Sequence, residues 1–395
     1  MIILGIHDGH AASAALSIDG KIAFAAQEER FTGVKNECGF PKRAVQCLLS
    51  AFQLKPHQIH EVAVATRQSD MNEIRTRREC VYSVSDYVRE MEEYWKPRLS
   101  GKPYDENYLV SLQDKDLRFV HADDVYEYPS HLYELPPDER SLAWEKVRRA
   151  CIARFLGVTE SKVVTYDHHA CHVYYSYFAN PRPKDPTVGL TIDGWGDGRN
   201  LTIWAIEGGK FRLLADSAEC VLARAYRLAT LYLGMKPLEH EFKVMGLAPY
   251  AKEKDSEQVY QVLRRVCKVD GMRVVHDQRP ADLYQFMLDR FRHHRFDSVA
   301  GGVQKWLEQN CLQLLRNVHQ ATGVRNFVFG GGCAMNVKLN MLLSEQEFVD
   351  DFFVAGSSAD ESLSIGACYA ANLSRQIENH PLENLYLGPA PTSEE

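Results

Sequence analysis

The sequence lacks any long hydrophobic run. Of its 395 residues, 45% are hydrophobic and 25% are charged, and no apolar stretch approaches the roughly 20 residues that a helix needs to cross a bilayer. The opening segment, MIILGIHDGH, also lacks the basic start and small-residue cleavage site of a secretory signal. We therefore expect a cytoplasmic protein without a membrane-spanning segment.

Paired cysteines are also missing. None of the ten cysteines stands in a CxxC motif, and they lie scattered between Cys38 and Cys368, which is typical of reduced thiols rather than of a disulfide framework or a zinc knuckle. The net charge of -7 argues against a broad nucleic-acid-binding surface, although a local basic groove stays compatible with it.

An internal repeat is the main sign of the fold. Residues 2–27 alternate apolar runs with Asp-Gly turns at residues 8–9 and 19–20, which predicts three consecutive strands. The same order returns in residues 188–215, where Asp193-Gly194 marks the first turn. Duplication of this kind indicates two related subdomains that face a cleft.

Further patterns predict α/β layers. Short β runs at residues 60–66, 162–166 and 326–330 alternate with helical stretches, and an apolar stripe from Val303 to Val318 predicts a core helix. We predict a first subdomain over residues 1–186 and a second over residues 187–395. Residues 67–150 are rich in charge, tyrosine and proline, and we interpret them as an insertion in the first subdomain.

Two histidines and a carboxylate form a candidate metal site. His168 and His172 lie four positions apart in YDHHACHVYYSYF, so a helix would place both imidazoles on one face, where they can share a cation. The alternative is a pair of hydrogen-bonded or surface histidines. Asp360 follows an apolar strand at the expected start of a helix, where a carboxylate either caps the helix or binds metal.

A run of three glycines forms a candidate nucleotide site. The segment FVFGGGCAMN joins a strand to a helix through residues 330–332, without the lysine and spacing of a Walker loop and without the GxGxxG pattern. Glycines let a backbone approach phosphate closely at a helix start, but a tight structural turn explains them equally well. The Asp-Gly turns can hold phosphates through backbone amides, and His10, which follows the first of them, either takes part or stabilises its own turn.

Taken in order, eight segments resemble the nodulation and antibiotic O-carbamoyltransferase family. They are GIHDGHAASAAL, AAQEERFT, DHHACH, TIDGWGDG, EFKVMGLAPYA, GGGCAMN, ADESLSIG and LYLGP. The resemblance spans nearly the entire chain. It implies a duplicated actin/Hsp70/sugar-kinase-like fold of the ribonuclease-H-like type around a central cleft, as in tRNA threonylcarbamoyl-adenosine transferases. It also implies the reaction: carbamoyl phosphate and ATP give carbamoyl adenylate, and the carbamoyl group then passes to an acceptor hydroxyl.

The resemblance also implies roles for individual residues. His168, His172 and Asp360 match the family's metal ligands, with Fe2+ as the expected divalent ion. His10 matches the histidine beside the carbamoyl group and is the expected general base. Contacts to ATP or carbamoyl adenylate are expected at Asp8, Gly9, Asp193, Gly194, Gly330, Gly331, Gly332 and Asn336.

The chain departs from the family pattern in two places. The family usually has aspartate after its first histidine, where this sequence has Ala11, which raises the question of how His10 is held. Full-length relatives continue after LYLGP into a YrdC-type domain that makes the adenylate, whereas this sequence ends at Glu395. We therefore expect a separate chain, or a segment outside this sequence, to supply that step.

The acceptor stays open at the level of sequence. We favour a hydroxyl or hydroxymethyl group of a small metabolite or sugar over hydroxymethylcytosine in DNA. Basic residues such as Arg75 and Arg78 stand near Tyr82 and Tyr87 in the insertion, a mixture suited to phosphates and bases, but interleaved acidic residues are typical of a solvated helix face. An actin-like kinase or ATPase, a non-catalytic acceptor-binding subunit and a homo-oligomer are further hypotheses.

Overall fold

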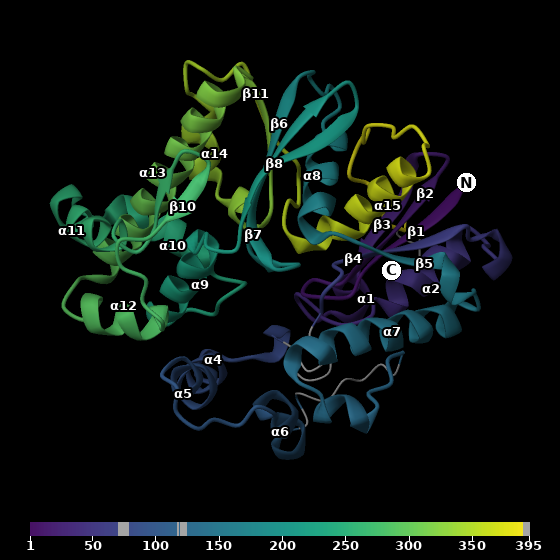
Figure 1. Ribbon diagram of the computed structural model, residues 1–395, viewed down its shortest axis with the longest axis horizontal. Helices are drawn as coiled ribbons and strands as arrows, with labels where there is room; N and C mark the ends of the chain where they lie inside the picture. The colour runs from purple at the N-terminus through teal and green to yellow at the C-terminus, as the bar shows by residue number, and fades with distance from the viewer. Residues whose placement is uncertain (70–78, 117, 119–124, 390–395) are drawn as a thin grey trace.

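Two five-stranded sheets of identical topology form the framework of the protein. The computed structural model describes residues 1–69, 79–116, 118 and 125–389 (Figure 1). The strand order is β3-β2-β1-β4-β5 in the first sheet and β8-β7-β6-β11-β12 in the second. In each sheet three antiparallel strands come first in the chain, and two further strands extend the sheet in parallel. The predicted duplicated α/β fold is confirmed.

The strands coincide with the predicted β runs. The first sheet contains β1 (Ile2–His7), β2 (Ser13–Ile18), β3 (Lys21–Gln27), β4 (Glu61–Ala65) and β5 (Val163–Tyr166). The second contains β6 (Thr187–Gly196), β7 (Arg199–Glu207), β8 (Lys210–Ser217), β11 (Asn326–Gly330) and β12 (Asp351–Val354).

The first turn of the second unit lies four residues later than predicted. We expected it at Asp193-Gly194, but β6 continues to Gly196 and the turn is formed by Asp197 and Gly198, whose φ values are 49° and 78°. A two-residue hairpin turn of type I′ requires positive φ at both central residues, and Asp-Gly provides it. The motif DGWGDG contains two Asp-Gly pairs, so the pattern alone could not select the second. As a result, Asp193 lies on the strand and not in the turn.

The last helix of each unit packs on the sheet of the other. Helix α8 (His168–Phe178) follows β5 but lies against β6 and β11, whereas α15 (Leu363–Ser374) follows β12 but lies against β1, β2 and β4. The two helices also pack on each other in the middle of the molecule (Figure 1). Helices from both sides of residue 186 thus pack on the opposite sheet. The boundary after residue 186 therefore stays a prediction.

Most remaining helices surround the second sheet. Helix α13 (Phe296–Thr322) buries Val303, Trp306 and Val318 in the largest apolar cluster, as the predicted stripe requires. Its neighbours include α9 (Leu222–Tyr232), α10 (Glu241–Leu247), α11 (Glu253–Leu263), α14 (Val337–Ser344) and β9 (Lys268–Asp270). Helix α12 (Leu283–Phe291) packs on α9, and β10 (Arg273–Val275) pairs with β9. The first sheet carries α1 (Glu29–Thr32) and α2 (Lys42–Ala51).

The predicted insertion connects the two units. It contains α4 (Val84–Glu90), a π-helical turn (Met91–Trp95), α5 (Lys96–Leu99), α6 (Tyr108–Lys115) and most of α7 (Pro137–Leu156). Trp144 of α7 is buried in the core of the first unit. Tyr82 and Tyr87 are buried in a cluster with Leu231 and Tyr284 of the second unit, so these two rings serve packing and are not free to stack on bases.

Two further expectations concern the surface. The predicted phosphate contacts Arg75, Arg77 and Arg78 lie outside the described residues. Within the described ranges, no helix combines the length and the apolar character that a membrane span requires.

The contact between α8 and α15 depends on Gly366. A Cβ atom at this position would lie 2.2 Å from the carbonyl oxygen of Cys171 on α8. We expect Gly366→Ala to lower the free energy of unfolding by about 1–3 kcal/mol, because a packed core resists an added methyl group. Urea unfolding followed by circular dichroism measures this. Gly246→Ala on α10 is the control, since a Cβ there meets no atom within 4 Å; equal effects of the two changes would contradict the close contact.

Candidate functional site

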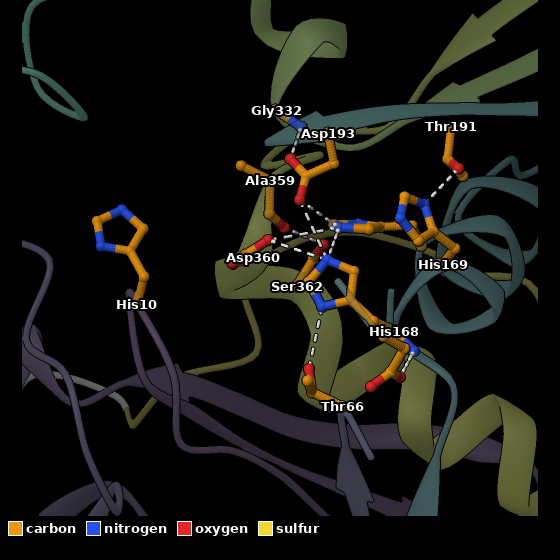
Figure 2. A network of polar contacts seen from close by, with 12 residues as sticks. His10, Thr66, His168, His169, Thr191, Asp193, Gly332, Ala359, Asp360 and Ser362 are labelled. Carbon is orange, nitrogen blue, oxygen red and sulfur yellow. Dashed lines mark hydrogen bonds and ion pairs between the residues drawn. The ribbon is translucent and has the colours of Figure 1, made fainter. Parts of the chain in front are cut away.

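Four side chains converge near the beginnings of α8 and α15. They belong to His168, His172, Asp193 and Asp360 (Figure 2), and one ligand atom from each lies within 4.8 Å of the others. His168 Nε2 lies 3.1 Å from Asp193 Oδ2 and 3.2 Å from His172 Nε2, and His172 Nε2 lies 3.4 Å from Asp360 Oδ1. The structure therefore brings the three predicted metal-site residues together. It adds Asp193, which we expected among the nucleotide contacts because of its Asp-Gly pair.

Local structure places each member of this group. Asp167 caps α8 by accepting a hydrogen bond from the backbone N–H of Ala170 at 2.9 Å, so His168 and His172 start on adjacent turns of one helix face. Asp360 opens the short 3-10 turn that leads into α15. Asp193 is fixed from the glycine turn after β11, because the backbone N–H of Gly332 donates to its Oδ1 at 2.8 Å.

Glycine provides the space for this arrangement at two points. A Cβ at Gly196 would lie 2.2 Å from the imidazole ring of His168, and one at Gly332 would lie 2.9 Å from Asp193 Oδ1. Gly332 was predicted to approach a nucleotide; the structure shows that its turn approaches Asp193. Gly196 was missed, although it stands in the same TIDGWGDG motif as Asp193.

Opposite charges within the group overcome the cost of burial. Burial acts to raise the pKa of Asp193, yet the hydrogen bond and charge of His168 and the charge of His172 hold it far below its usual value. Burial and the neighbouring Asp193 act to raise the pKa of Asp360. The two histidines nevertheless lower it below its usual value. In turn, burial opposes a charge on His168, but Asp360 and Asp193 raise its pKa to about 9. The two carboxylates thus require positive charge beside them.

The donor atoms fit a divalent metal ion. Two imidazole nitrogens and two carboxylate oxygens suit Fe2+, Mn2+ or Zn2+. His168 Nδ1 lies 3.0 Å from Thr66 Oγ1, and such an outer hydrogen bond is common for a metal-binding histidine because it fixes the tautomer. His172 Nδ1 is buried without a hydrogen-bond partner among the described residues.

Arg148 of α7 supports Thr66, the hydrogen-bond partner of His168 outside the metal-site group. Its Nη1 donates to the carbonyl oxygen of Thr66 at 2.8 Å, while its Nε and Nη2 bind the carboxylate of Asp8 at 2.7 and 2.5 Å. The Tyr126 hydroxyl donates to the same carboxylate at 2.5 Å. The side chains of Arg148 and Asp8 are 0% and 2% exposed. The carboxylate of Asp8 is therefore satisfied inside the protein, and a phosphate contact through the amides of this turn stays a prediction.

Asp197 joins the two units next to the metal-site group. Its carboxylate accepts from the backbone N–H groups of Arg67, Gln68 and His168 at 3.1, 2.7 and 2.7 Å. It thereby fixes the chain just after β4 to the start of α8. Neither Asp197 nor Arg148 was singled out from the sequence, because their partners are separated from them by 29 to 140 residues.

His10 stands apart from the metal-site group (Figure 2). It is half-buried, and its Nδ1 has no hydrogen-bond partner among the described residues. Its carbonyl oxygen lies 3.0 Å from Nε2 of His7, and Ala11 next to it has a φ of 56°. His7 thus holds this loop. In the family, the residue after the first histidine, which is Ala11 in this chain, is usually an aspartate. Burial lowers the pKa of His7 to about 4, so this ring is neutral; sequence reasoning overlooked it beside His10.

Two glutamates lie near His10. Burial raises the pKa of both Glu241 and Glu361, and His10 acts on each in the opposite direction. The backbone N–H of Leu238 donates to Glu241 at 2.8 Å. Two acidic groups of the second unit are therefore within electrostatic range of His10.

The other predicted nucleotide contacts differ in their surroundings. Asn336 caps α14 by accepting from the backbone N–H of Leu339 at 3.0 Å, and its amide pairs with that of Gln304 at 2.9 and 3.1 Å. Its side chain thus serves the protein itself. Gly331 adopts a φ of 84° beside Ile192, and Gly330 ends β11. Gly194 faces open space, since a Cβ there would meet no atom within 4 Å.

The buried pair of Arg148 and Asp8 generates a stability prediction. Arg148→Met leaves the Asp8 carboxylate buried without its partner, and we expect the free energy of unfolding to fall by about 3–5 kcal/mol. Tyr126→Phe, a milder change, should cost about 1–3 kcal/mol. Chemical denaturation provides the measurement. Arg154→Met is the control on the same helix, because its pair with Glu127 is exposed and should contribute little to stability. The assignment fails if Arg148→Met is no more destabilising than this control.

Comparisons with known proteins agree with the earlier resemblance. An uncharacterized protein of Methanocaldococcus jannaschii is 24% identical over 98% of this chain and 60% of its own length. The nodulation protein NolNO of Sinorhizobium fredii is 23% identical over 97% of this chain and 49% of its own length. The chain thus spans about half to three fifths of these relatives.

Solved structures with a similar fold are more distant. Component A of the (R)-2-hydroxyglutaryl-CoA dehydratase of Acidaminococcus fermentans aligns over 95% of this chain and 99% of its own, with 12% identity and a TM-score of 0.47.

The family model described as the carbamoyltransferase N-terminus matches residues 2–369. The chain therefore belongs to the carbamoyltransferase N-terminal domain family.

Proposed function

We propose that this chain transfers a carbamoyl group from carbamoyl adenylate to the hydroxyl of a small acceptor. The observation that carries the proposal is the convergence of His168, His172, Asp193 and Asp360 beside the glycine turn at Gly332, in a chain of the carbamoyltransferase family. Acyl transfer needs a base for the hydroxyl and positive charge near the developing oxyanion. The group around Asp193 and the separate His10 can serve these two needs.

The four-residue group would hold one divalent ion, and we propose Fe2+. Two histidines with carboxylates are a frequent environment for this ion. When bound, the ion supplies Lewis-acid polarisation of a carbonyl or phosphate oxygen of the donor. The protein contributes the fixed positions of the ligands: α8 orients both histidines, Gly332 fixes Asp193, and Thr66 sets the tautomer of His168.

His10 is the proposed general base. A ring nitrogen of this half-buried side chain takes the proton of the acceptor hydroxyl while that oxygen forms a bond to the carbamoyl carbon. The bond between this carbon and the phosphate oxygen then breaks, and AMP leaves with the electron pair.

The adenine nucleotide is proposed to lie along the turns that surround Asp193. Gly331 and Gly332 bring backbone close to this carboxylate, and the open space at Gly194 leaves room for phosphate. Carbamoyl phosphate and ATP are the proposed source of the adenylate, made by a YrdC-type domain. Relatives such as NolNO, of which this chain spans 49%, are long enough to carry a further domain.

Metal content tests the proposed ligands. We expect purified protein to bind about one divalent ion per chain and Asp193→Asn, Asp360→Asn and His172→Ala to lose most of it, because each removes a ligand atom. Elemental analysis after reconstitution with Fe2+ measures this. His169→Gln is the control, since this neighbour on α8 instead bonds Thr191. Wild-type metal content in Asp193→Asn would exclude Asp193 from the ligand set.

Transfer from preformed carbamoyl adenylate tests the reaction. We expect the chain to release AMP and carbamoylate a hydroxyl acceptor, and His10→Ala to slow this by roughly 10²- to 10⁴-fold, as loss of a general base does. Mass spectrometry of acceptor mixtures detects the added carbamoyl group. His57→Ala, an exposed change, should have no effect. Phosphorylated acceptor formed from ATP, without any carbamoylated product, would instead identify a kinase.

A further inference from the structure

Trp195 is an exposed aromatic residue beside the metal-site group. Its relative exposure is 51%, and it follows Asp193 by two residues on β6, so the two Cα atoms lie within about 7 Å. Gly194 between them faces open space. A large ring that stays in water gains little for folding. The position therefore offers a flat apolar surface next to the reacting groups.

Arg224, in the first turn of α9, covers this ring. Its guanidinium carbon lies 5.4 Å from the ring centroid of Trp195, within the range of a cation–π contact. The side chain reaches solvent, and no carboxylate of the described residues lies within ion-pair distance of it. Arg224 is thus an accessible cation whose five donors are available to a ligand.

The surroundings of Arg224 are positively charged. Its pKa is lowered, first by burial around the guanidinium and then by the charges of Arg227 and Arg279, whereas Glu219, which pairs with Arg279, acts in the opposite direction. Arg227 itself lies 5.8 Å from the ring of Tyr87 in the insertion. Figure 1 shows α9 between the second sheet and α4. Arg224 and Arg227 therefore extend from the exposed ring of Trp195 on β6 toward the insertion.

We propose that Trp195 and Arg224 form the acceptor site, and that the acceptor is a nucleotide or another phosphorylated aromatic ring compound. This inference rests on the proposed transferase function and narrows its substrate class. The acceptor ring stacks on Trp195, as bases do on exposed aromatic side chains. Its phosphate forms a paired hydrogen bond with Arg224, whose fork geometry matches phosphate oxygens. A polycationic amino sugar is disfavoured by the arginines around this surface.

Calorimetric titration of the full chain tests the site without any need for catalysis. The probes are hydroxymethyl-deoxycytidine monophosphate, the same nucleoside without phosphate, AMP and the amino sugar kanamycin. We expect Trp195→Ala to weaken both pyrimidine probes by roughly 10-fold or more. Arg224→Gln should weaken the monophosphate by a similar factor and leave the nucleoside unchanged, because only the phosphate contacts the guanidinium.

Two control variants separate the site from general surface effects. Arg212→Gln on β8 and Tyr386→Ala near residue 389 change exposed side chains elsewhere and should leave all affinities unaltered. A further titration replaces the monophosphate by a short single-stranded oligonucleotide with the same base. It distinguishes a free nucleotide from a nucleic acid as the acceptor. Losses in both site variants with either probe support the proposal.

Three results would overturn it. One is unchanged affinity of the monophosphate in both variants. Another is an equal loss of AMP affinity, which would assign Trp195 and Arg224 to the donor nucleotide. The third is kanamycin binding that depends on Trp195. If the pyrimidine probes bind as expected but no carbamoyl transfer occurs, the site stands and the proposed reaction fails, so the two failures can be told apart.

Discussion

The close contact between α8 and α15 is the constraint on which the site depends. Each helix follows the last strand of its unit and packs on the opposite sheet, and Gly366 lets the two backbones touch. Because the helices begin on the same side of this contact, His168 from one and Asp360 just before the other come within reach of a single ion. Separation of the helices would therefore remove the ligand set and the core between the sheets together.

Two buried acidic sites differ in how their charge is balanced. Asp8 is neutralised inside the protein by Arg148, with a further hydrogen bond from Tyr126. Asp193 and Asp360 have only histidines beside them among the described residues. A buried carboxylate with an arginine is complete as it stands, whereas two carboxylates that share imidazoles gain from an added cation. This difference distinguishes a structural acidic site from one arranged for a ligand.

Sequence reasoning succeeded where local periodicity carries the information. Alternating apolar residues predicted the strands of both units, the stripe from Val303 to Val318 predicted α13, and the i,i+4 spacing placed His168 and His172 on one helix face. It failed where contacts join distant segments. The bond between Thr66 and His168 spans 102 residues, and that between Arg148 and Asp8 spans 140.

One failure has a local cause. The motif DGWGDG offers two Asp-Gly pairs with the same turn propensity, and only the length of β6 decides that the turn falls at Asp197. Asp193 thus precedes the turn, and its carboxylate reaches His168 on α8. The strand is extended by pairing with β7, which no single-segment pattern contains.

The three hydrogen bonds to Asp197 also define where the molecule can bend. In a rigid rotation, the displacement of an atom grows with its distance from the axis, and atoms at the axis stay in place. Asp197 holds the end of β4 and the start of α8 at one point, so a rotation of the units that keeps these bonds must pass close to it. His168 would barely move, because its backbone N–H is one of the three donors to Asp197. A rotation of this kind would therefore leave His168 in place beside a bound ion.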